Sequence, residues 1–206
     1  MSSAKRYGGT VSIIIYMTAT SIDGFLADSN NSLDWLLAVE GGEDAFAEFQ
    51  LFIAGVSVIV EGSTTYEWVI DHEHLLERPT KWQELYGDKK TFVFSSRPGE
   101  LPRVPNADVE FISGPLTEHL ASILAAAGDG DVWVVGGATI AAQFAAIGRL
   151  DEIWLSVAPV FLGGGAPLFS ARLSAEMLRL TDVHQTGQFV QLRYALEPAT
   201  TMRSSA

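Results

Sequence analysis

Glycine-rich turns after apolar runs are the parts of this chain best suited to chemistry. Gly136 and Gly137 follow the apolar run Val132–Val135 and precede an alanine-rich stretch, residues 138–147, with apolar residues at helical spacing. This pattern predicts a buried strand, a tight turn and a helix N-terminus. The free N–H groups of a first helical turn favour an anion, and glycines let a phosphate approach the backbone closely. The competing interpretation is a tight turn whose glycines serve only the backbone conformation.

Two more turns of this kind occur earlier in the chain. The motif Gly62-Ser63-Thr64-Thr65 follows the apolar run Val56–Val60, and Ser95-Ser96-Arg97 closes another expected strand, Thr91–Ser95. The carboxyl ends of parallel strands share one edge of a sheet, where ligands bind. Three such turns on one edge therefore predict a dinucleotide site, and the guanidinium of Arg97 suits a phosphomonoester.

The alternation of elements predicts an α/β fold. Strand and helix patterns alternate through the first two thirds of the chain, and two strand patterns, Met177–Val183 and Gln188–Leu196, flank a turn at Gln185-Thr186-Gly187. We expect a mostly parallel central sheet with flanking helices and a C-terminal antiparallel hairpin. One domain would span residues 11–197, between a disordered N-terminal tail, residues 1–10, and a loose C-terminal tail, residues 198–206.

Composition narrows the classes of function. The net charge of −12 over 206 residues argues against nucleic acid and against an anionic membrane surface as partners. There is no cysteine, which excludes disulfides, thiolate metal sites and a cysteine nucleophile. No apolar run reaches the about 18 residues of a membrane span. We expect a cytoplasmic protein with a small-molecule substrate and no metal site.

Five motifs together resemble a known family. They are Thr20-Ser21-Ile22-Asp23-Gly24-Phe25, Ser32-Leu33-Asp34-Trp35, Gly62-Ser63-Thr64-Thr65-Tyr66-Glu67, Val134-Val135-Gly136-Gly137-Ala138, and the segment Pro159–Phe169 with Gly163-Gly164-Gly165 inside it. In this order they resemble the dihydrofolate reductase superfamily. The resemblance is strongest to the branch that includes the reductase domain of bacterial riboflavin biosynthesis, and it covers residues 11–197.

The resemblance implies a reductase that transfers hydride from NADPH to a small heterocyclic or carbonyl-type substrate. Its implied cofactor-binding residues are Ala19, Asp23, Gly24, Gly62, Ser63, Thr64, Thr65, Ser95, Ser96, Arg97, Gly136, Gly137, Ala138 and Thr139. Within this set, Ser96 and Arg97 would hold the 2′-phosphate of the adenosine. Asp34 and Trp35 would lie towards the substrate, with Asp34 as the candidate for proton transfer.

Two departures from the family pattern keep other functions open. Many relatives carry an arginine where this chain has Ser63, so NADH is a possible cofactor as well. The riboflavin enzymes carry an Asp-Asp-Pro run where this chain reads Trp68-Val69-Ile70-Asp71-His72. The alternatives are a pteridine or pyrimidine reductase of folate or riboflavin metabolism, and a nucleotide-binding protein without catalysis.

Several candidate residues also have structural interpretations. Asp23 could stabilise a turn through its side chain, and Asp34 could cap the helical turn that begins at Trp35. Trp35 could stack on a planar substrate or lie at the edge of the core. The apolar segment Pro159–Phe169 predicts self-association, which we expect to give a homodimer.

Overall fold

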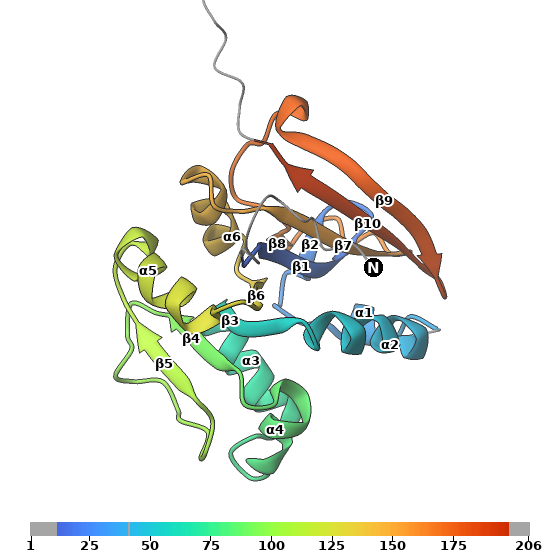
Figure 1. Cartoon of the computed structure of the whole chain (residues 1–206). Helices are drawn as coiled ribbons and strands as arrows, with labels where there is room; N and C mark the ends of the chain where they lie inside the picture. The colour runs from blue at the N-terminus through green and yellow to red at the C-terminus, as the bar shows by residue number, and fades with distance from the viewer. Residues whose placement is uncertain (1–11, 41, 198–206) are drawn as a thin grey trace, which may run out of the picture.

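A single twisted sheet organises the protein (Figure 1). The structure is a computed structural model that describes residues 12–40 and 42–197. The eight strands lie in the order β5-β4-β3-β6-β1-β7-β10-β9. They are β1 (Ile14–Ser21), β3 (Val56–Gly62), β4 (Lys90–Phe94), β5 (Val109–Ile112), β6 (Asp131–Gly136), β7 (Glu152–Ala158), β9 (Leu178–Thr186) and β10 (Phe189–Leu196). All pairings from β5 to β7 are parallel, whereas those of β10 with β7 and β9 are antiparallel.

Helices cover both faces of this sheet. The helices are α1 (Asp34–Leu37), α2 (Gly42–Ile53), α3 (Ser63–Glu73), α4 (Thr80–Tyr86), α5 (Leu116–Ala127) and α6 (Ala138–Ala146), with a short 3-10 helix at Ala175–Met177. Side chains of α5 and α6 pack in the core on one face, and those of α2, α3 and α4 pack in the core on the other. The fold class expected from the sequence, including the C-terminal hairpin, is confirmed.

Two parts of the chain form regular structure that their local sequence does not favour. Residues 71–88, which Pro79 and Gly87 mark as irregular, contain α4, because Trp82 and Tyr86 are buried in the core against α3. The long loop after β1 contains β2 (Phe25–Ala27), which pairs with β8 (Ala166–Pro167) in a separate two-stranded sheet. The expected tails, residues 1–10 and 198–206, lie outside the described residues. Within the described chain, no helix has both the length and the apolar character that a membrane crossing requires.

Very short turns connect β3 to α3 and β6 to α6. Helix α3 begins directly after Gly62, and α6 begins at Ala138, with only its N-cap residue Gly137 between it and β6. Gly137 has a φ of 88°, in the left-handed region that an L side chain rarely adopts. A Cβ atom at Gly136 would lie 2.8 Å from the Oγ1 atom of Thr65. The backbone conformation therefore favours glycine at residue 137, and packing against the Thr65 side chain favours it at residue 136, whatever binds beside them.

A carboxyl group is buried near the end of β3. Glu61 is 1% exposed, and its Oε2 atom has no hydrogen-bond partner among the described residues. Burial raises the pKa of Glu61 from 4.5 to about 8. Burial, and to a smaller extent the charge of an ionised Glu61, raise the pKa values of Tyr66 and Tyr86. The folded protein consequently favours the protonated form of this side chain.

Glu61 should make the fold less stable at high pH. Because its pKa is raised on folding, its contribution is fully present below about pH 4.5 and is lost as the pH rises towards 8. We expect the free energy of unfolding to fall across this window by up to about 1.4 kcal/mol per pH unit. In Glu61→Gln this dependence should disappear. Urea unfolding at pH 5, 7 and 9 measures it, and Glu84→Gln on the exposed face of α4 is the control. Equal slopes in the parent and Glu61→Gln would contradict the assignment.

The conformation of Gly137 should be visible in stability. Gly137→Ala places an L side chain at a positive φ, and we expect a loss of roughly 1–2 kcal/mol. Its Cβ would meet only Ile140 Cδ1, at 3.5 Å, as its nearest neighbour, so the cost is conformational. Gly164→Ala is a matched control, because its Cβ would meet nothing within 4 Å and its φ is not in the positive region. Similar thermal melts for both variants would refute this prediction.

Candidate functional site

A cleft of about 890 Å³ opens at the carboxyl ends of the central strands. Its walls come from β1, the loop after β2, α2, the start of α3, the β6–α6 turn and β10. Parallel strands place their carboxyl ends together, so the cleft lies where the sequence pattern predicted a ligand. Because β3 and β6 are neighbours in the sheet, the helices that follow them begin side by side.

One end of the cleft carries two helix N-termini without side-chain caps. The N-cap residues are Gly62 for α3 and Gly137 for α6, neither helix has a side-chain hydrogen bond at its cap, and neither has an acidic residue in its first turn. The first N–H groups of a helix have no acceptor within that helix, and the helix dipole places partial positive charge there. This end of the cleft can therefore hold a pyrophosphate.

Seven of the expected cofactor residues line the cleft. They are Ala19, Thr64, Thr65, Gly136, Gly137, Ala138 and Thr139. The hydroxyl groups of Thr64, Thr65 and Thr139 add donors to the backbone N–H groups. The remaining candidates do not belong to the lining. They are Asp23, Gly24, Gly62, Ser63, Ser95, Ser96, Arg97, Asp34 and Trp35.

Arg97 lies on the same edge of the sheet, outside the cleft. Its backbone N–H donates to Ser95 Oγ at 2.9 Å, and its Nη1 atom is 3.1 Å from Glu100 Oε2. The Arg97 side chain is 61% exposed. An exposed ion pair of this kind contributes little to stability, so a phosphate could replace Glu100 as its partner at low cost.

Asp23 serves the architecture of the cleft rim. Its carboxylate accepts hydrogen bonds from the Ser21 hydroxyl at 2.6 Å and from the backbone N–H groups of Leu162 and Gly163 at 3.0 and 2.7 Å. These bonds, with that from Ser21 contributing most, lower the pKa of Asp23 to about 2. They tie the turn after β1 to the glycine-rich loop at residues 163–165 and favour the structural interpretation of this residue.

Asp34 and Trp35 are not brought into the cleft. Asp34 is exposed at the start of α1, where Leu33 is the N-cap and no side-chain cap hydrogen bond forms. The Trp35 side chain is half-buried, and its indole nitrogen has no partner among the described residues. Their neighbours Leu33 and Leu36 line the cleft instead. The apolar residues of this segment line the cleft, and the expected roles of Asp34 and Trp35 towards a substrate stay predictions.

Aromatic side chains form much of the other end of the cleft. Phe46 and Phe49 of α2, Trp133 of β6 and Phe189 of β10 belong to the lining. The rings of Phe49 and Trp133 meet edge to face with centroids 5.3 Å apart, and the Trp133 indole N–H donates to the Met17 carbonyl at 3.0 Å. We call the part of the cleft lined by these four aromatic residues the aromatic chamber. It can hold a flat ring and exclude water from it.

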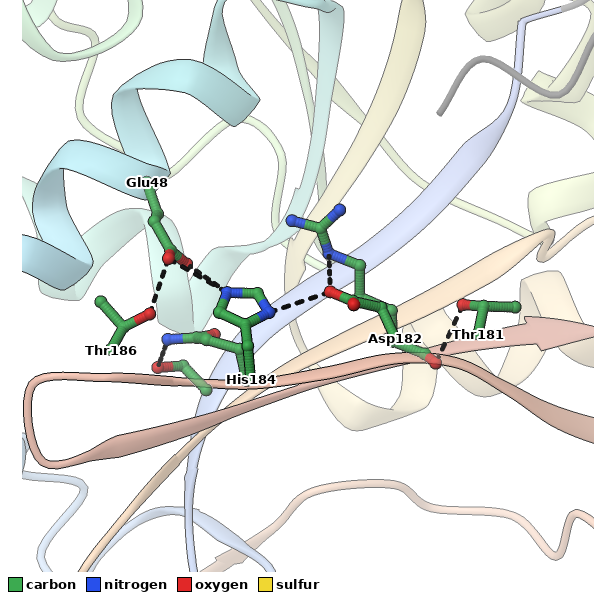
Figure 2. Close-up of polar contacts among 8 residues, drawn as sticks. Glu48, Thr181, Asp182, His184 and Thr186 are labelled. Carbon is green, nitrogen blue, oxygen red and sulfur yellow. Dashed lines mark hydrogen bonds and ion pairs between the residues drawn. The ribbon is translucent and has the colours of Figure 1, made fainter. Parts of the chain in front are cut away.

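One carboxylate lines the cleft beside the aromatic chamber, at a residue that no sequence motif indicated. Glu48 is the only charged residue among the described residues that line the cleft. Its Oε1 atom accepts a hydrogen bond from the Thr186 hydroxyl at 2.6 Å and lies 3.0 Å from His184 Nε2 (Figure 2). The helical spacing of Phe46, Phe49 and Phe52 is typical of an amphipathic helix such as α2, but nothing local indicates partners of Glu48 that lie 136 and 138 residues away.

A neutral pair completes the polar part of the chamber. Gln191 of β10 donates from Nε2 to Ser156 Oγ of β7 at 2.9 Å, and both residues line the cleft. In the described part of the chain, no three histidine, aspartate or glutamate side chains cluster as metal ligands would. The chemistry available in the chamber is therefore that of one carboxylate, two neutral polar side chains and aromatic rings.

Comparisons with known proteins agree with this architecture. The model of the RibD C-terminal domain family matches residues 12–192. The uncharacterized protein YwjB of Bacillus subtilis is 32% identical over 182 residues, which are 88% of this chain and 95% of YwjB.

Solved structures extend the likeness to the fold. A putative riboflavin biosynthesis protein from Shewanella sp. PV-4 superposes with a TM-score of 0.74 at 25% identity, over 90% of this chain and 99% of that one. Dihydrofolate reductase from Enterococcus faecalis, solved with NADP(H) and RAB-propyl, superposes with a TM-score of 0.58 at 12% identity, over 90% and 97% of the two chains. This chain has the fold of dihydrofolate reductase and belongs to the RibD C-terminal domain family.

Proposed function

We propose that this protein is an NADPH-dependent reductase that transfers hydride to a small heterocyclic or carbonyl-type substrate. One observation carries the proposal: a single cleft joins two uncapped helix N-termini to an aromatic chamber with one carboxylate. Membership of the RibD C-terminal domain family supports a reductase of the riboflavin or folate type. Pteridine and pyrimidine rings are therefore the first substrates to test.

The residues at the glycine-rich end fit a dinucleotide. Gly136 and Gly137 leave the backbone open to a pyrophosphate, and the first turns of α3 and α6 would supply N–H donors together with the hydroxyl groups of Thr65 and Thr139. A bound nicotinamide cofactor supplies the hydride. The chain itself binds and orients the two reactants, and the aromatic chamber excludes water from them.

Two further features belong to this proposal. The compartment is the cytoplasm, which suits a chain without cysteine. The assembly is a homodimer, because the apolar segment Pro159–Phe169 carries a phenylalanine, Phe161, that is 71% exposed. The small-molecule substrate would then be the only other partner.

Binding and turnover together test the function. We expect NADPH to bind and to be oxidised with at least one of 7,8-dihydrofolate, 7,8-dihydrobiopterin and pyridine-3-carbaldehyde, which offer a C=N or C=O bond to hydride. Calorimetry measures binding, and the loss of absorbance at 340 nm measures oxidation. Binding without turnover over this panel and related pyrimidines would favour a nucleotide-binding protein without catalysis. No binding of NADPH or NADH would refute the proposal.

Arg97 should distinguish NADPH from NADH. If it pairs with the 2′-phosphate, Arg97→Ala should weaken NADPH binding by about 10- to 100-fold and leave NADH binding unchanged. Arg179→Ala is a matched control, because Arg179 is equally exposed and also pairs with a glutamate, Glu197. Titrations of both variants with both cofactors measure the effect. Equal losses for NADPH and NADH, or none, would show that Arg97 does not bind the 2′-phosphate.

A further inference from the structure

We propose that His184 and Asp182, on the edge strand β9, deliver a proton from solvent to Glu48, and that Glu48 donates it to the substrate during reduction. This inference rests on the proposed function. Figure 2 shows the arrangement, in which Glu48 of α2 reaches His184 and Thr186 of β9, with Asp182 on the far side of the imidazole ring. The three β9 side chains are two residues apart and so lie on one face of the strand.

Both ring nitrogens of His184 face carboxylates. Nε2 lies 3.0 Å from Glu48 Oε1 and 3.3 Å from Oε2, and Nδ1 lies 2.9 Å from Asp182 Oδ2. A neutral imidazole carries one N–H, so only one of these contacts could be a hydrogen bond if both carboxylates were ionised. A second proton makes both contacts favourable. The line Asp182–His184–Glu48 is therefore built to hold a proton that can move between its members.

The residues around the two ends of this line differ, and the difference favours movement of a proton from His184 towards Glu48. At the outer end, Arg193 Nε lies 3.9 Å from Asp182 Oδ2, and the Arg193 guanidinium stacks 3.9 Å from the centroid of the Trp154 ring. The outer carboxylate of the line therefore lies near a cation. At the inner end, the Thr186 hydroxyl holds Glu48 Oε1, and Glu48 lines the cleft. A proton on His184 consequently has a carboxylate acceptor that borders the chamber.

Solvent reaches the two ends unequally once a substrate is bound. A ring in the chamber would cover the cleft side of Glu48 and displace water from it. The side chains of His184 and Asp182 are 36% and 45% exposed, and β9 is the outermost strand of the sheet. Their position allows the proton on Glu48 to be replaced from solvent without opening of the cleft.

The step balances in atoms and charge. Reduction of a C=N or C=O bond adds hydride from NADPH to carbon and a proton to nitrogen or oxygen, and leaves NADP⁺. The carboxyl group of Glu48 supplies that proton, the imidazolium of His184 restores it, and a proton taken up from solvent at the exposed Asp182 side recharges His184, so the cycle consumes one solvent proton. His184 acts through Glu48 and does not itself meet the substrate.

The decisive variant is His184→Gln. Its side-chain amide can still donate to Glu48 and hold it in place, but it cannot take up and release a proton. We expect kcat for a panel substrate to fall about 10- to 100-fold, with an increased solvent deuterium isotope effect and an unchanged dissociation constant for NADPH. In His184→Gly, added imidazole should restore part of the lost rate. Glu48→Gln should lower kcat at least as much.

Two controls separate proton delivery from support of the structure. Thr186→Val removes the other hydrogen bond to Glu48 but leaves the line intact, so its rate should exceed that of His184→Gln and should not respond to imidazole. His119→Gln changes a half-buried histidine outside the cleft, on α5, whose ring contacts the Ser113 carbonyl, and its rate should match that of the parent. Thermal melts of every variant show which of them fold.

The possible results distinguish this inference from the function on which it rests. A parent that oxidises NADPH with a panel substrate, beside a His184→Gln variant of equal kcat and equal isotope effect, overturns the proton line alone. Loss of rate in both His184→Gln and Thr186→Val without rescue by imidazole in His184→Gly also overturns it and leaves only a supporting role. A parent that binds NADPH but reduces nothing overturns both proposals.

Discussion

The adjacency of two parallel strands, β3 and β6, is the constraint on which the site depends. Their register pairs Val60 with Val134 and Glu61 with Gly136, and helices begin directly after both strands. Two helix N-termini therefore face one cleft, and their partial positive charges add. The approach is so close that a Cβ at Gly136 would meet Thr65 Oγ1 at 2.8 Å. Glycine at residue 136 thus allows the start of α3 to pack against the end of β6.

Much of the glycine-rich end of the cleft could be predicted, because the residues that form each turn are neighbours in the sequence. A buried strand, a glycine turn and a helix start are contiguous in the chain, and residues of these turns such as Thr65 and Thr139 line the cleft. Their role in binding a cofactor stays a prediction. Where packing between distant elements decides, local patterns were insufficient. Helix α4 forms despite the flanking Pro79 and Gly87, because burial of Trp82 and Tyr86 in the core outweighs the weak helical pattern.

The chamber end was predicted less well, for the opposite reason. Its carboxylate, Glu48, contacts Thr186 and His184, which lie more than 130 residues later in the chain, so its importance cannot be inferred from its local sequence. The local motif Ser32-Leu33-Asp34-Trp35 instead predicted Asp34 as the group that transfers a proton, and the structure leaves this side chain exposed on a one-turn helix. A strand face with polar residues at every second position, such as Asp182, His184 and Thr186, is the one signal that could have indicated a polar contact.

The distribution of charge explains how a protein of net charge −12 can offer a site to an anionic cofactor. Among the described residues, the cleft has no cationic side chain, so backbone N–H groups and hydroxyls are left to receive the phosphates. The single carboxylate, Glu48, lies beside the aromatic side chains, and its own side chain is 34% exposed. Its contacts with Thr186 and His184 hold it in place. A ring bound in the chamber would displace water from the cleft side of Glu48 and strengthen its field there, so one carboxylate is enough to orient or protonate a substrate.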